Sequence, residues 1–158
     1  MSLKIQKRNG EIAAFNPTKI HNRIKKAAKG LSVNSDEIFI KVITSVPTEG
    51  IITSKQIDKL VAEIAASYTG SHYDYSRLAA IVSISSYHKE TKESFCDTME
   101  DLNQAKIVND EMINIINRYG KENIDNAINS NNDYNFDFFA WRSLFEMYLL
   151  KIDRKSVV

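Results

Sequence analysis

The sequence predicts a mainly α-helical protein, in which a small N-terminal β-hairpin packs on a helical bundle and further helices follow. Three observations support this fold class. Alternating apolar and polar residues flank Asn9-Gly10, as in a short hairpin. From Asn16 onward, cap residues repeatedly precede apolar residues at helical spacing. The length of 158 residues fits one domain, or one small domain and part of another.

The first predicted element is a hairpin from Leu3 to Phe15. Leu3 and Ile5 alternate with polar residues, Asn9-Gly10 suits a tight primed turn, and the chain returns from Ile12. Because two strands alone are marginally stable, we expect this hairpin to lie on helices.

Two helices are predicted next. Asn16 is a good N-cap for the first, Pro17 fits its first position, and Gly30 ends it. Ser35 is the predicted cap of the second, "SDEIFIKVITSV", and Pro47 follows its end.

The remaining helices follow from the same signals. A third begins at Thr53 or Ser54, and Asp74 caps a fourth that we expect to continue from about Tyr75 to beyond Leu102. "DEMINIINRY" is a predicted helix, with Asn109 as its N-cap and Gly120 at its end. "ENIDNAI" is predicted to form a short helix. An Asn-rich polar loop then leads into the aromatic stretch 138–152.

Composition excludes several classes of protein. The apolar runs fall far short of the ~20 residues that cross a bilayer, and no signal-peptide pattern is present, so we expect a cytoplasmic protein. The single cysteine, Cys96, excludes an internal disulfide and a CxxC metal site, and we expect a buried, inert thiol. His21, His72 and His88 lack partners at metal-ligand spacing.

Positive charge is concentrated at the N-terminus. Residues 1–30 contain eight Lys and Arg against Glu11 alone, a net +7, whereas the remainder sums to −6. A helix start presents unpaired N–H groups, and Lys19 lies in the first turn after Asn16. A hairpin could bring one or both of Lys7 and Arg8 beside it, which would make a group of cations suited to a triphosphate. No GxxxxGK[ST] or GxGxxG motif occurs, so we expect nucleotide binding without turnover.

Several segments together resemble one family. "KRNG", "FNPTKI" and "GIITSKQIDKLVAEIAA" resemble the ATP-cone, the regulatory nucleotide-binding module of many ribonucleotide reductases. "YDYSRLAAIVSISSYHKETKESFCDTMEDL" is similar to the end of that module and its exit helix in class I large subunits, and "DYNFDFFAWRSLFEMYLLKI" to the following helical region. The resemblance implies an ATP-cone at 1–92 and the start of a truncated helical region at 93–158.

The resemblance also implies an effector site. Lys7, Arg8, Lys19 and Lys89 match residues that hold the effector, Asp58 matches an acid near base and sugar, and Thr53 or Ser54 matches a hydroxyl at a helix start. The segment from Ala13 to Lys19 corresponds to a loop around the nucleotide. The implied site is Lys7, Arg8, Ala13, Ala14, Phe15, Asn16, Pro17, Thr18, Lys19, Thr53, Ser54, Asp58 and Lys89. One departure is Ala13, where the family usually has Glu; Glu11 is nearby in a shifted register.

By this resemblance the effector is ATP or dATP, with or without Mg²⁺, and the chain itself holds no catalytic residue or catalytic cofactor. The implied partners are the remainder of the large subunit, its oligomer and the small radical-generating subunit, with no membrane or nucleic acid. Two alternatives stay open: a nucleotide-responsive DNA-binding regulator using the basic first helix, and a degenerate ATP-cone acting only in subunit assembly.

Overall fold

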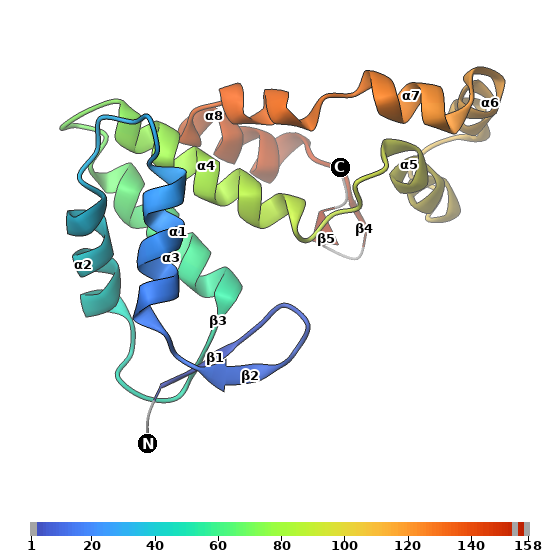
Figure 1. The fold of residues 1–158 in the computed structure, drawn as a ribbon. Coiled ribbons are helices and arrows are strands. Elements are labelled where there is room, and N and C mark those ends of the chain that lie inside the picture. Colours follow the sequence, from blue (N-terminus) through green and yellow to red (C-terminus); the bar gives the residue numbers. More distant parts are fainter. Residues whose placement is uncertain (1–2, 153–154, 157–158) are drawn as a thin grey trace. The chain divides into compact units, whose positions relative to one another are not determined.

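The computed structural model describes residues 3–152 and 155–156 (Figure 1). The chain divides into two compact units. The first comprises Met1–Ser86 and Phe136–Trp141, and the second comprises Tyr87–Asn135 and Arg142–Val158.

A three-stranded sheet lies at the start of the first unit. Its strands are β1 (Lys4–Gln6), β2 (Ile12–Ala14) and β3 (Ile51–Thr53), in the order β2-β1-β3. β1 pairs antiparallel with β2 and parallel with β3, so that Ile5 lies between Ala13 and Ile52. The predicted hairpin is confirmed, but the prediction missed β3. The hairpin therefore has a third strand as well as helices to support it.

The hairpin turn differs from the predicted one. The Lys7 N–H donates to the Glu11 carbonyl (2.8 Å), and the Gly10 N–H donates back to the Lys7 carbonyl (3.0 Å). Arg8 and Asn9 are thus the central turn residues. Gly10 follows with a φ of +86°, whereas Lys106 is the one described non-glycine residue with positive φ. A primed turn centred on Asn9-Gly10 is therefore wrong; the loop has three residues, with glycine in the left-handed position.

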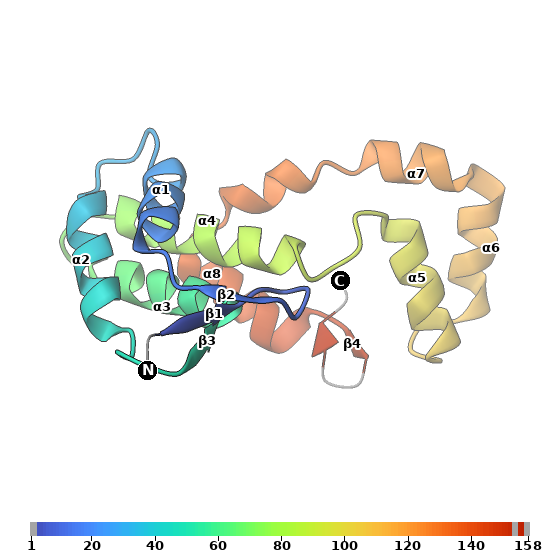
Figure 2. The same cartoon turned by 60° about the horizontal axis from the view of Figure 1, so that its bottom comes forward.

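Four helices and the first four residues of α8 (Phe138–Ser143) complete the first unit (Figures 1 and 2). The four helices are α1 (Pro17–Ala27), α2 (Ser35–Ser45), α3 (Ser54–Ser67) and α4 (Asp74–His88), whose last two residues belong to the second unit. α1 directly follows β2 and α3 directly follows β3, so both helices begin beside the sheet. Each of these four helices contributes fully buried apolar side chains to the core: Ile24, Ile38, Val42, Val61, Leu78 and Ile84.

Cap residues explain where these helices begin. The Asn16 side chain accepts the Lys19 N–H (3.3 Å), and Pro17 is the first residue of α1, as predicted. The predicted cap of α2 is wrong by one residue, because Asn34 accepts the Glu37 N–H and Ser35 lies inside the helix. Asparagine and serine are both good caps, so the sequence "NS" left the choice open.

The long fourth helix of the prediction is two helices. α4 ends at His88, and α5 (Phe95–Gln104) begins after the Ser94 hydroxyl accepts the Asp97 N–H (3.0 Å). The intervening segment, "KETKES", is polar. The segment has no apolar side chain whose burial would stabilise a continuous helix here. Its serine, Ser94, is instead a strong N-cap for a new helix.

The second unit holds α5 and a series of short elements. They are α6 (Asp110–Tyr119), α7 (Lys121–Ala127), a 3₁₀ turn (Ser130–Asn135), the last two residues of α8 (Phe138–Ser143), a π-helical turn (Leu144–Tyr148), β4 (Lys151–Ile152) and β5 (Lys155–Ser156). Asn109 caps α6 and Gly120 ends it, as predicted. A small core of Cys96, Met99, Leu102 and Ile116 joins α5 to α6.

One further prediction concerns the cysteine of this unit. Cys96 is fully buried, as expected, and burial raises the pKa of its thiol. Within the described part of the chain, none of the helices combines the length and hydropathy that crossing a lipid bilayer requires.

Candidate functional site

The hairpin turn carries two of the predicted cations. Lys7 pairs with Glu11 across the turn, with 2.9 Å between Nζ and Oε2, and both side chains are about half exposed. Arg8, at the centre of the turn, points elsewhere: its Nη2 donates to Asp58 Oδ2 (3.0 Å) and Ser86 Oγ (2.6 Å). The turn thus presents Lys7 to solvent and directs Arg8 towards α3 and α4.

The predicted loop leads from β2 into α1. Ala13 and Ala14 lie in β2, Phe15 and Asn16 form the junction, and Pro17, Thr18 and Lys19 form the first turn of α1. The hydrogen bond from Lys7, with smaller contributions that include the charge of Lys19, holds the pKa of Glu11 below its ordinary value. Glu11 is therefore the acidic partner of Lys7 at the hairpin turn.

Asp58 is the buried centre of the site. It is only 3% exposed, and its Oδ1 accepts from Arg23 Nε (2.9 Å) while Oδ2 accepts from Arg8. A buried carboxylate is costly unless it is paired, so these two guanidinium groups stabilise its charge. One carboxylate consequently ties together the hairpin turn, α1, α3 and, through Ser86, α4.

Arg23 was not among the predicted site residues. It lies one turn after Lys19 on α1, at the i+4 spacing that places two side chains on one helix face. That spacing was the available signal, but helix-face lysines and arginines are usually solvated. Its partner, Asp58, is far away in the sequence.

The two hydroxyls proposed for the site, those of Thr53 and Ser54, lie at the start of α3. Thr53 is the N-cap: its Oγ1 accepts the Gln56 N–H (3.0 Å), and Gln56 Oε1 accepts the Thr53 N–H (2.8 Å). This capping box engages the Thr53 hydroxyl with its own helix. Ser54 is the first residue inside α3.

Lys89 belongs to the second unit. It follows α4 directly, and its side chain is exposed. In the first unit, ion pairs join Arg8 and Arg23 to Asp58, and Lys7 to Glu11.

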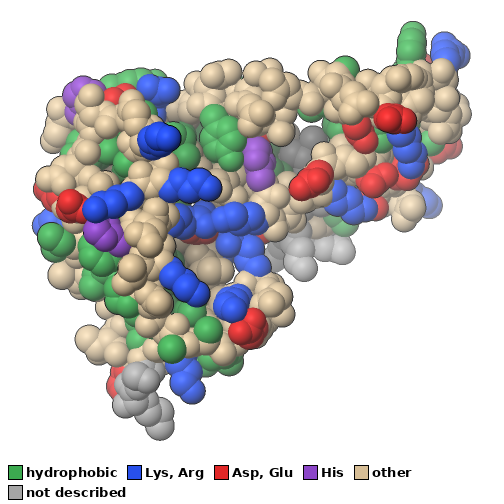
Figure 3. Space-filling view, in the orientation of Figure 1, with side chains coloured by type: hydrophobic (Ala, Val, Ile, Leu, Met, Phe, Trp, Pro, Cys, Tyr) green, Lys and Arg blue, Asp and Glu red, His purple; other side chains and the backbone are tan. Residues whose placement is uncertain are grey.

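Surface charge agrees with this grouping. Figure 3 shows Lys and Arg side chains gathered over α1 and the adjacent hairpin of the first unit. Among the described residues no cluster of three or more His, Cys, Asp or Glu is suited to a metal ion. The cationic face itself favours an anionic ligand.

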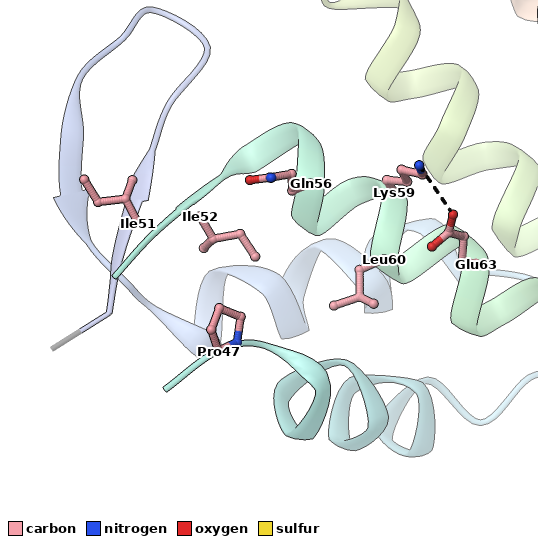
Figure 4. A pocket seen from close by; sticks show the side chains of 7 residues that line it. All are labelled: Pro47, Ile51, Ile52, Gln56, Lys59, Leu60 and Glu63. Atoms are coloured by element: carbon pink, nitrogen blue, oxygen red, sulfur yellow. Dashed lines mark ion pairs between the residues drawn. The ribbon is translucent and has the colours of Figure 1, made fainter. Parts of the chain in front are cut away.

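A pocket of about 370 Å³ lies against another face of α3 (Figure 4). Its walls come from the segment before β3, from β3 and from α3: Pro47, Ile51, Ile52, Gln56, Lys59, Leu60 and Glu63. Lys59 and Glu63 pair at 3.8 Å. This largely apolar pocket contains none of the predicted site residues and has one internally paired cation, so it offers little to a polyphosphate.

Known proteins share this sequence pattern. Residues 3–90 match the family described as the ATP cone domain. Over 96% of the chain, the sequence is 37% identical to the ribonucleoside-diphosphate reductase large subunit of Monkeypox virus, covering 21% of that protein. The large subunit of Danio rerio is 34% identical over 97% of the chain, with 20% of that protein covered. The large chain of Schizosaccharomyces pombe is 33% identical over 96% of the chain, again with 20% covered.

The chain thus spans about a fifth of the length of these relatives. The family match covers more than half of the chain. It includes the three-stranded sheet and helices α1 to α4, which carry Lys7, Arg8, Lys19 and Arg23 or contact them. The protein therefore belongs to the ATP-cone family.

Proposed function

We propose that this chain is the regulatory N-terminal portion of a ribonucleoside-diphosphate reductase large subunit and that it binds ATP or dATP. One observation carries the proposal: in a chain that matches the ATP cone, Lys7, Arg8 and Lys19 come from the hairpin and the start of α1. The amino end of α1 adds its own partial positive charge. Cations of this kind, together with a helix start, suit a triphosphate.

Each proposed site residue has a role. Lys7, Arg8, Lys19 and Lys89 neutralise the phosphates, and any Mg²⁺ reaches the site through phosphate oxygens. Residues 13–19 wrap the nucleotide. Asp58, with a hydroxyl of Thr53 or Ser54, acts on the side of the base and sugar. Asp58 is buried and contacts Arg8 and Arg23. We therefore propose that it acts on the base and sugar indirectly, by orienting these two arginines.

Regulation follows from a small chemical difference. ATP and dATP differ only in the ribose 2′-hydroxyl, so they regulate only by stabilising different arrangements of the protein. A coupling of ~1–3 kcal/mol is typical, and one or two altered hydrogen bonds supply it.

The proposed context is a cytoplasmic enzyme that reduces ribonucleotides to deoxyribonucleotides. In this proposal residues 1–92 form the ATP-cone and residues 93–158 begin the next helical region. The reductases that the sequence resembles use a set of active-site cysteines. This chain has one cysteine, Cys96, which is buried and cannot form a redox pair by itself, so catalysis belongs to the remainder of the large subunit. Its partners are that remainder, the large-subunit oligomer and the small radical-generating subunit. The relatives favour this reading over a DNA-binding regulator.

Calorimetric titration of the 158-residue chain with ATP and dATP tests the proposal. We expect both nucleotides to bind, and Lys19→Ala to weaken each by about tenfold, the size of a lost charge-assisted hydrogen bond. Lys59→Ala, on the pocket face of α3, is the matched control and should leave both affinities unchanged. A folded chain that binds neither nucleotide would refute effector binding and leave an ATP-cone that acts only in assembly.

A further inference from the structure

Asp58 accepts hydrogen bonds from two arginines, Arg8 and Arg23. It is the one buried charged residue in the described part of the chain. Two guanidinium groups contact it, one on each carboxylate oxygen, so the trio carries a net positive charge. A single arginine would neutralise one carboxylate, and the second therefore requires its own explanation.

The two arginines are held differently. Arg8 sits in an exposed three-residue turn, with its side chain 25% exposed, and contacts Asp58 through the terminal Nη2. Arg23 rises from the middle of α1 and contacts Asp58 through Nε; its Nη2 is buried and meets no acceptor among the described residues. Arg8 thus projects from a turn and Arg23 from a helix, and their side chains are similarly exposed, at 25% and 31%.

We propose that Arg23 is a positioning residue that keeps Asp58 neutralised when an effector draws Arg8 away. This inference rests on the proposed function, in which Arg8 contacts phosphate. If Arg8 were the sole partner, turning towards the effector would leave a buried, unpaired carboxylate, which is strongly unfavourable. With Arg23 on Oδ1, Arg8 leaves Oδ2 at a much lower cost. Arg23 therefore strengthens effector binding without touching the effector.

A double-mutant cycle separates this role from direct contact. ATP affinity is measured by calorimetry for the wild-type chain, Arg23→Met, Asp58→Asn and the double variant. With Asp58 present, Arg23→Met should weaken ATP binding by about tenfold or more, because Arg8 is then trapped on the carboxylate. In the Asp58→Asn background, the same change should alter affinity by less than about twofold, since no buried charge remains to be neutralised.

Two further variants control for charge and folding. Lys26→Met removes a positive charge from an exposed position on the same helix and should leave ATP affinity nearly unchanged. Arg23→Lys keeps a counter-charge near Asp58 and should restore most of the affinity. Circular dichroism reports folding; if Arg23→Met reduces the folded fraction, Arg23→Gln replaces it with the same expected ratios.

The outcomes are distinct. An equal loss of affinity in both backgrounds would mean that Arg23 itself binds the effector. No loss in the chain that retains Asp58 would mean that effector binding by Arg8 does not depend on Arg23. Either result overturns the inference but not the proposed function. A wild-type chain that binds neither ATP nor dATP overturns the proposed function and this inference together.

Discussion

At the scale of single residues, Glu11 is the exposed acidic side chain beside the cationic turn, in contrast to the buried Asp58. Its carboxylate lies 2.9 Å from Lys7 Nζ, and the charge of Lys19 also lowers its pKa. In the proposed function, an anionic effector would compete with this carboxylate for Lys7. We therefore infer that Glu11, two residues before Ala13, opposes effector binding.

We predict that Glu11→Gln strengthens ATP binding. The Lys7–Glu11 pair is exposed, and such pairs are weak, so the expected gain is at most about fivefold. Glu63→Gln, which removes the partner of Lys59 on the pocket face, is the control and should have no effect. If Glu11→Gln weakens binding instead, Glu11 contacts the nucleotide and takes the place of the glutamate that Ala13 lacks.

Sequence reasoning placed correctly in the fold those candidate residues whose structural signals are local. Asn16 and Lys19 could be placed because a cap and a first-turn cation are read from neighbouring positions. Arg23 could not, because its significance depends on Asp58, which packing brings close from a distant helix. Buried ion pairs between helices leave no periodic trace in a single sequence.

At the scale of elements, the same contrast holds. Helix ends with one strong cap or stop, such as Asn109 and Gly120, were predicted correctly. β3 was missed because its three residues, the last of which is the helix cap Thr53, are too few to show alternation, and its pairing with β1 is non-local. The break after α4 was missed because good helix formers occupy it, and only Ser94 marks the new start.

An acidic side chain also joins two elements of the second unit. Asp125, on α7, accepts the Ser94 hydroxyl (2.7 Å) and the Cys96 N–H (3.0 Å) at the start of α5. These hydrogen bonds, Ser94 first, hold the pKa of Asp125 below its ordinary value of 3.8. The stabilisation is therefore complete above that value and is lost as pH falls through the lower pKa of the folded state.

We predict that Asp125→Ala loosens α7 from α5. Cys96 should then react several-fold faster with a thiol reagent at neutral pH, because its burial depends on this contact. The difference in Tm between wild type and variant should be full at neutral pH and shrink as the pH falls below 3.8. Glu122→Ala, at an exposed position of α7, is the control. An unchanged labelling rate would show that Asp125 does not hold the two helices together.

At the scale of the whole molecule, the uneven charge should govern how affinity depends on salt. The chain is nearly neutral, yet residues 1–30 carry +7. Raising ionic strength from about 0.1 M to about 1 M shortens the Debye length from about 10 Å to about 3 Å, which screens the exposed lysines from the phosphates. We therefore predict that ATP affinity falls at least about fivefold over this range. AMP, with fewer charges on the same base and sugar, should show a clearly weaker dependence, and equal dependence for the two nucleotides would mean that the N-terminal charge does not recognise the polyphosphate.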